Sequence, residues 1–237
     1  MGFFENKFFY FFLLIITISF PLLRSFENKL SYYKKWGALI TAIIFMMAIH
    51  IPIDIVFTKL NVWSFNSDYV SGFYLFNLPI EEWLFFVIIP FSCVFIYEST
   101  NYFFQPKKAS EINFKFSLLF GILLIVLSFF FYERIYTSIY FSLSGITLIL
   151  LYLYRPKWWK KFQIMYVFSL IPFLAINGFL TGSFTEFPIV FYNNEENLGL
   201  RILNIPIEDT LYCFNILVAV VAVYEYRLSK MFSIEEN

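Results

Sequence analysis

Two short acidic motifs are the part of this sequence best suited to chemistry. Each consists of a proline, an isoleucine and two adjacent carboxylic acids: Pro79-Ile80-Glu81-Glu82 and Pro206-Ile207-Glu208-Asp209. In a buried pair, one carboxyl can hold a proton while a hydrogen-bonded neighbour stays ionised, so the pair can both donate and accept protons. The alternative is helix capping, because proline starts helices well and acids favour the positive N-terminal end of a helix.

The two motifs belong to an internal repeat with an offset of 127 residues. Without a gap, residues 48–98 match residues 175–225 at 15 of 51 positions. The matches include asparagine, glycine, proline and glutamate, which a shared membrane composition does not explain. Because the motif is duplicated with its neighbours, we favour a functional role over capping for all four acids. They are Glu81, Glu82, Glu208 and Asp209.

The composition is that of a membrane protein. Hydrophobic residues make up 60% of the 237 residues and charged residues 14%, whereas soluble domains are about 45–50% apolar. The formal net charge is zero, which leaves no broad basic field for binding nucleic acid. We therefore expect an integral membrane protein with the lipid bilayer as its main surroundings.

Seven apolar runs approach the length of about 20 residues that crosses a bilayer. They are approximately Phe8–Leu23, Trp36–Thr58, Pro79–Tyr97, Phe116–Tyr132, Tyr136–Tyr154, Ile164–Thr181 and Pro206–Tyr226. The sequence thus predicts an all-α fold of about seven transmembrane helices. The offset places helices one to three on helices five to seven, a parallel tandem repeat joined by helix four. The predicted units are residues 1–104, a connector over 105–134, and residues 135–237 with a short cytoplasmic tail.

Basic residues indicate the orientation of these helices. Every odd-numbered helix is followed by a segment that carries several lysines or arginines, while the loops after helices two and six carry few. Cytoplasmic loops retain such residues. We expect a bacterial inner-membrane protein with its N-terminus outside and its C-terminus in the cytoplasm. Parallel repetition then places both acidic pairs at the same outer depth, facing each other across a shared cavity.

Polar and aromatic residues near the motifs are candidates for the wall of that cavity or for supporting the acids. They are His50, Asn177, Asn66, Asn193, Trp63, Trp83, Phe65 and Tyr192. His50 is the repeat equivalent of Asn177, which favours a hydrogen-bonding role over general-base duty. The alternative for the two loop asparagines is ordinary loop capping. Glu98 and Glu225, at the far ends of the motif helices, are expected to be interfacial anchors.

Several motifs are missing from the sequence, and their absence narrows the chemistry. The chain has no glycine-rich dinucleotide fingerprint, no phosphate-binding loop and no aspartate-rich diphosphate motif. The single histidine argues against a metal site, so we expect neither a metal nor a cofactor. A retinal protein would need a lysine in the last helix, and Pro206–Tyr226 contains none.

The duplicated motifs make the chain similar to the membrane-integral lycopene cyclases, in the form that carries both units on one chain. The resemblance includes Trp83-Leu84-Phe85-Phe86 after the first motif and the asparagine and glycine that precede each motif. It implies cofactor-free, redox-neutral conversion of the ψ ends of lycopene into β-ionone rings, giving β- or γ-carotene. It also implies that the four motif acids carry this acid/base chemistry, that Pro79 and Pro206 fix the start of the helices, and that other carotenoid-pathway enzymes are candidate partners.

Two other classes of function fit the same residues. A carotenoid- or quinone-binding membrane protein, or a proton-coupled transporter, would use buried carboxyls to relay protons without cyclising a substrate. A purely structural subunit would tolerate replacement of the four acids by amides. Asp209 has a shorter side chain than its equivalent Glu82, which predicts that the two halves are unequal.

Overall fold

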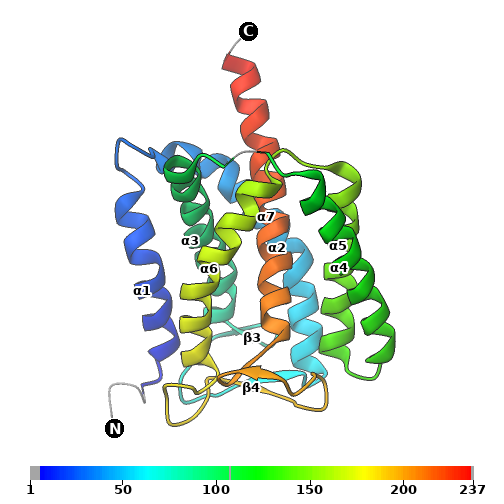
Figure 1. Ribbon diagram of the computed structural model, residues 1–237. Helices are drawn as coiled ribbons and strands as arrows, with labels where there is room; N and C mark the ends of the chain where they lie inside the picture. The colour runs from blue at the N-terminus through cyan, green and yellow to red at the C-terminus, as the bar shows by residue number, and fades with distance from the viewer. Residues whose placement is uncertain (1–5, 107, 236–237) are drawn as a thin grey trace.

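The computed structural model describes residues 6–106 and 108–235, which form a bundle of seven α-helices and one short 3-10 helix (Figure 1). The helices are α1 (Phe9–Arg24), η1 (Tyr32–Lys35), α2 (Trp36–Lys59), α3 (Ile80–Phe104), α4 (Glu111–Phe130), α5 (Ile135–Tyr154), α6 (Trp159–Leu180) and α7 (Glu208–Glu235). The N-terminal end of α1 and the C-terminal end of α7 lie at opposite ends of the bundle.

Six of these helices are long and apolar enough to cross a membrane, and α1 is the exception. At 16 residues it is shorter than the roughly 20 residues of a typical span, yet it lies alongside the bundle and packs against α3. Large apolar side chains such as Phe129 and Phe130 are exposed on the outer faces, where lipid tails would cover them. The prediction of an all-α integral membrane fold is confirmed.

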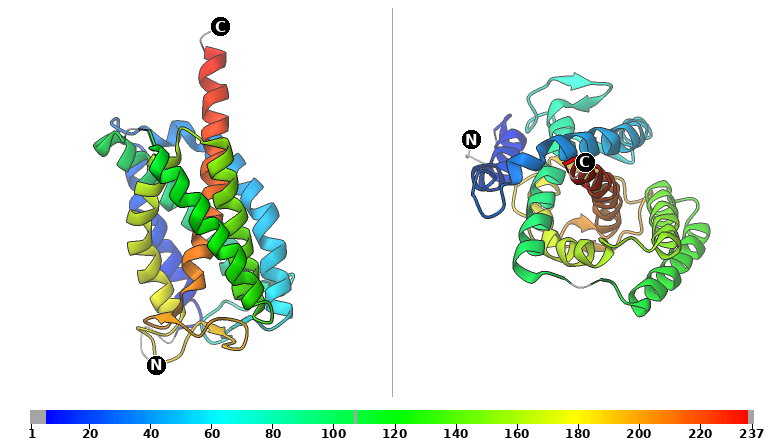
Figure 2. Two further views of the ribbon diagram at one scale, coloured as in Figure 1. Left: turned by 45° about the vertical axis from the view of Figure 1, so that its right-hand side comes forward. Right: turned by 90° about the horizontal axis from the view of Figure 1, so that it is seen from above.

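The tandem repeat is visible element by element. Shifting the chain by 127 residues places α1 on α5, α2 on α6 and α3 on α7, with α4 as the connector. The packing repeats as well, since α2 packs on α7 and α3 packs on α6. Viewed from above, α4 and α5 stand together at one side of the bundle (Figure 2). Their backbones approach closely at Gly121 and Gly145, where a Cβ added to Gly145 would lie 2.7 Å from the Gly121 carbonyl oxygen.

Six short strands lie at the end of the bundle near the N-terminus, and they follow the same repeat. They are β1 (Trp63–Phe65), β2 (Tyr74–Leu75), β3 (Leu78–Pro79), β4 (Val190–Tyr192), β5 (Arg201–Ile202) and β6 (Ile205–Pro206). β2 pairs with β3 and β5 with β6, while β1 pairs with β4 across the two halves. In that last pair Ser64 lies opposite Phe191, its own repeat equivalent. A pseudo-twofold axis therefore passes through this point.

The structure corrects some expected boundaries. Pro79 and Pro206, predicted to open the third and seventh helices, lie in β3 and β6 instead, and Pro79 is the extended N-cap of α3 with φ −64° and ψ 150°. A proline can occupy this pairing position because it needs no N–H there. α3 continues to Phe104 rather than ending at Tyr97, because polar residues near its end are buried inside the bundle.

Candidate functional site

A small cavity lies at the strand end of the bundle, on the inside of the β1–β4 pair. It has a volume of about 30 Å³, and every α-helix except α4 contributes to its wall. The lining residues are Tyr10, Asp54, Trp63, Phe65, Glu82, Phe85, Tyr136, Asn177, Leu180, Val190, Tyr192, Asp209 and Tyr212. Three carboxyl groups, four tyrosines and three other aromatic rings thus share one enclosed space, and none of the lining residues is a lysine or an arginine.

Glu82 and Asp209, the second acids of the two motifs, are both buried in this wall. The Tyr10 hydroxyl donates to Glu82 Oε2 at 2.7 Å. Asp209 accepts two such bonds, from the Tyr136 hydroxyl to Oδ1 at 2.7 Å and from the Tyr192 hydroxyl to Oδ2 at 3.0 Å. Hydrogen bonds to a carboxylate stabilise its charged form. Hydrogen bonds therefore stabilise the charged form of Asp209 more than that of Glu82.

The Tyr192 hydroxyl remains a hydrogen-bond donor to Asp209 in this arrangement. Burial, followed by the negative charge of Asp209, raises the pKa of Tyr192 well above the ordinary value. The hydroxyl thus stays protonated over the physiological pH range. Tyr192 reaches Asp209 from β4, so the pairing of the two halves also positions this donor.

Glu81 and Glu208, the first acids of the motifs, do not line the cavity. Both are fully buried, and each accepts a backbone N–H from the preceding loop at 2.7 Å, Glu81 from Ser71 and Glu208 from Leu198. Ser71 and Leu198 are repeat equivalents, so the two halves share this contact. Oε2 of each glutamate has no hydrogen-bond partner among the described residues. The four acids were expected to share one role, whereas the geometry separates them into two pairs.

Asp54 is a cavity residue that the sequence analysis missed. It lies in the C-terminal part of α2, is 1% exposed, and its Oδ1 is 3.5 Å from the Tyr212 hydroxyl. A signal was present, because an acid inside an apolar run is costly in a membrane and marks a functional site. Tyr10, Tyr136 and Tyr212 were also missed, and nothing in their sequence surroundings distinguishes them from the other tyrosines of this aromatic-rich chain.

The remaining predicted residues divide between cavity and support. Trp63, Asn177, Phe65 and Tyr192 lie in the cavity wall. His50 is buried outside it, with its ring 6.3 Å from that of Tyr212. Asn66, Asn193 and Trp83 do not reach the cavity: each asparagine accepts a backbone N–H two residues on, and the Trp83 indole donates to the Leu75 carbonyl. Among the described residues, no group of three or more histidines, cysteines or acids is placed to hold a metal ion.

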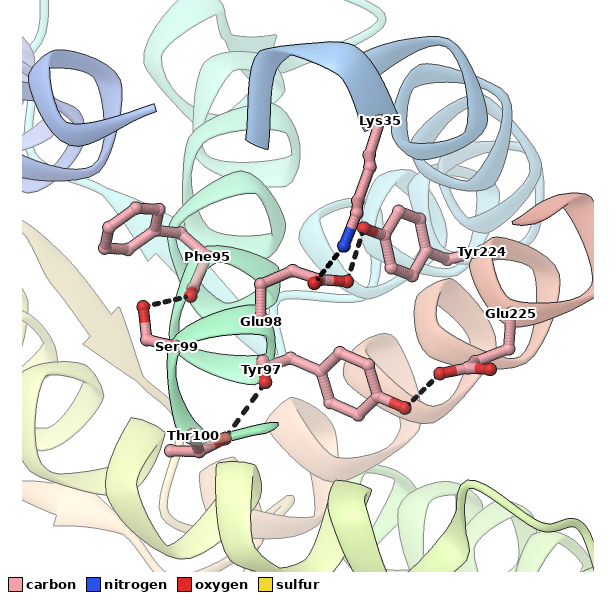
Figure 3. A network of polar contacts seen from close by, with 8 residues as sticks. All are labelled: Lys35, Phe95, Tyr97, Glu98, Ser99, Thr100, Tyr224 and Glu225. Carbon is pink, nitrogen blue, oxygen red and sulfur yellow. Dashed lines mark hydrogen bonds and ion pairs between the residues drawn. The ribbon is translucent and has the colours of Figure 1, made fainter. Parts of the chain in front are cut away.

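A second polar network joins α3 and α7 at the opposite end of the bundle (Figure 3). The Tyr97 hydroxyl donates to Glu225, and the Tyr224 hydroxyl donates to Glu98 at 2.7 Å. These two contacts are repeat equivalents of each other. Lys35, from the first half of the repeat, adds an ion pair to Glu98. Glu98 was expected to be an interfacial anchor, but it is buried inside the bundle. The network joins the two halves at the end of the bundle that is far from the cavity.

The fold and the cavity define an integral membrane protein with a duplicated helical unit and an enclosed, aromatic site of carboxyl groups. The family model for lycopene cyclase matches residues 6–100 and again residues 133–227, and the chain belongs to that family. The two matched segments are related by the same offset of 127 residues as the repeat, and each contains one acidic motif. No curated protein sequence and no solved structure matches the chain.

Membership of this family implies a carotenoid substrate and cyclisation of that substrate. A long apolar polyene partitions into the bilayer, which agrees with the six long apolar helices. Cyclisation of a carotenoid end needs a proton donor and a proton acceptor. Carboxyl groups, which can take either role, line the cavity.

Proposed function

We propose that this chain is a lycopene β-cyclase, which converts ψ ends of lycopene into β-ionone rings by cofactor-free acid/base catalysis. The observation that carries the proposal is the pair of Glu82 and Asp209. These repeat-related carboxyls line one aromatic cavity, and they differ in how strongly hydrogen bonds support their charge. The family match supports cyclisation in general, and the β ring is our more specific proposal.

We assign the proton donor to Glu82 and the proton acceptor to Asp209. Asp209 is held as a carboxylate by two tyrosine hydroxyls, whereas Glu82 receives one. The O–H bond of Glu82 breaks as a C–H bond forms at the terminal double bond, which leaves a tertiary cation. The neighbouring double bond attacks this cation and closes the ring. Asp209 then removes a ring proton, so no net oxidation or reduction occurs.

The wall of the cavity suits a carbocation. Aromatic faces attract positive charge, and Trp63, Tyr136 and Tyr212 all contribute rings to the wall. The small volume of the cavity also limits the amount of water that could add to the cation. The observed volume of about 30 Å³ is about the space of one water molecule. A carotenoid end can therefore enter only when lining side chains or helices move apart.

We assign Glu81 and Glu208 to the support of the site rather than to proton transfer. Each carboxylate holds the loop that precedes its own motif through a backbone N–H. The loop in turn leads into the strand pair and the N-terminus of the motif helix. We further propose that the cavity lies at the outer side of the membrane, because the basic segments that follow α1, α3 and α5 lie at the other end of the bundle.

The experiment that tests this function is pigment analysis of lycopene-accumulating bacteria that express the chain. We expect β- or γ-carotene from the native chain, and unchanged lycopene from Asp209→Asn protein that is present in the membrane at native abundance. Rings of the ε type would contradict the β assignment alone. Unchanged lycopene with inserted native protein would contradict lycopene cyclisation and favour a carotenoid-binding protein or a proton-coupled transporter.

A further inference from the structure

Asp54 is a third carboxyl of the cavity, and the reaction described above does not use it. It is 1% exposed and comes from α2, which carries neither acidic motif. Its Oδ2 is buried with no hydrogen-bond partner among the described residues. A buried polar atom without a partner destabilises a fold, and an apolar residue would be more stable at this position. An acid placed there at such a cost indicates a role in the chemistry of the cavity.

The repeat shows that the fold itself does not require an acid at this position. The equivalent of Asp54 is Thr181, which lies outside the cavity and donates its hydroxyl to the Asn177 carbonyl at 2.8 Å. Tyr212, whose hydroxyl lies 3.5 Å from Asp54 Oδ1, likewise corresponds to Phe85 in the first half. The Asp54–Tyr212 contact thus exists on one side of the pseudo-twofold axis only. It distinguishes the two halves of an otherwise shared site.

The proposed reaction leaves a proton on the wrong carboxyl after each ring closure. Glu82 has lost its proton to the substrate, and Asp209 has gained one from the ring. No hydrogen bond joins Glu82 to Asp209 among the described residues, and both oxygens of Asp209 accept from tyrosines. A second ring cannot form until a proton returns to Glu82. Asp54 is the third carboxyl of the cavity, and its Oδ2 has no hydrogen-bond partner among the described residues, so it is free to accept or give this proton.

We propose that Asp54 is the proton relay that resets the site between two cyclisations, an inference that rests on the proposed function. Neutral Asp54 gives its proton to the Glu82 carboxylate, and Asp209 then gives the ring proton to the Asp54 carboxylate. Each transfer breaks one O–H bond and forms another, directly or through a single water, for which the cavity has room. The cycle consumes no proton and needs no cofactor.

The test compares one turnover with many turnovers in liposomes. With protein in excess over lycopene, Asp54→Asn protein should form the first ring at a rate within about twofold of the native rate. With lycopene in excess, its rate should fall by at least about tenfold, the scale of a lost acid/base group. Asp54→Glu should restore most of the multiple-turnover rate. Thr181→Val, at the equivalent position outside the cavity, serves as the matched control and should behave as native in both regimes.

Two results would overturn the relay. An equal loss in both regimes, from protein with a native melting temperature, would make Asp54 the proton donor or a support for the donor. Native rates in both regimes would remove Asp54 from the chemistry. A native chain that forms no ring in either regime would instead contradict the proposed function, so the two failures are distinguishable.

Discussion

The separation of the four motif acids into two pairs leads to a sharp prediction for Glu81 and Glu82, which are adjacent in the sequence. Glu81→Ala removes a buried hydrogen bond of 2.7 Å to the Ser71 N–H. A hydrogen bond to a charged group contributes about 1.5–3 kcal/mol to stability. At about 2–4 °C per kcal/mol for a chain of this size, we expect the melting temperature to fall by roughly 3–12 °C. The rate of ring formation by the folded fraction should stay within about threefold of native.

Glu82→Gln should behave in the opposite way. The Tyr10 hydroxyl can still donate to the amide oxygen that replaces Glu82 Oε2, so the melting temperature should change little. The rate should fall by about 10²–10⁴, because the amide cannot supply a proton. Lycopene conversion in liposomes, normalised to folded protein, gives the rate, and thermal unfolding in detergent gives the stability. Glu195→Gln, an exposed loop acid, is the matched control for loss of charge.

Either of two results would contradict the division of the motif acids into two pairs. One is a Glu81→Ala protein with native stability and a rate reduced a hundredfold. The other is a Glu82→Gln protein that keeps the native rate. Either would show that the cavity wall does not identify the acids that act on the substrate.

Contacts at the two opposite ends of the bundle can be tested separately. Tyr192→Phe removes one of the two hydroxyl donors to Asp209. A charge-assisted bond is worth about 1.5–3 kcal/mol, so we expect the rate to fall by about 10- to 150-fold. A rate equal to native would contradict the role of Tyr192. Lys35→Met leaves the buried Glu98 without its cation and should destabilise the protein by about 1–3 kcal/mol with little effect on the rate per folded molecule, as measured by thermal unfolding beside activity. A rate that fell while the stability stayed native would link this network to catalysis.

The sequence was sufficient to predict the helical membrane fold and the repeat. Long apolar runs give helices directly, and the offset of 127 residues survives in each helix and strand that the two halves share. The strands escaped prediction because each has only two or three residues, too few for an alternating pattern. α6 ends at Leu180, just before a loop in which Gly182 takes a positive φ of 80° beside Pro188.

The site was predictable in its residue types but not in its geometry. The motifs identified the acids, yet Glu81 and Glu82 are neighbours with the same chemistry, and only the folding of the preceding loop back onto Glu81 separates their surroundings. Tyr10 lies 72 positions from Glu82 in the chain, so no local pattern could connect them. Asp54 could have been found, since it is an acid within the apolar run of α2.

The most direct measurement of the central claim is the product formed by purified protein with lycopene in liposomes, for the native chain and for a Glu82→Gln, Asp209→Asn double variant of equal abundance and melting temperature. We predict a β-ionone ring from the native chain and unchanged lycopene from the double variant. A double variant that still forms the ring would contradict the assignment of the chemistry to these two acids, and a native chain that leaves lycopene unchanged would contradict the proposed cyclase function.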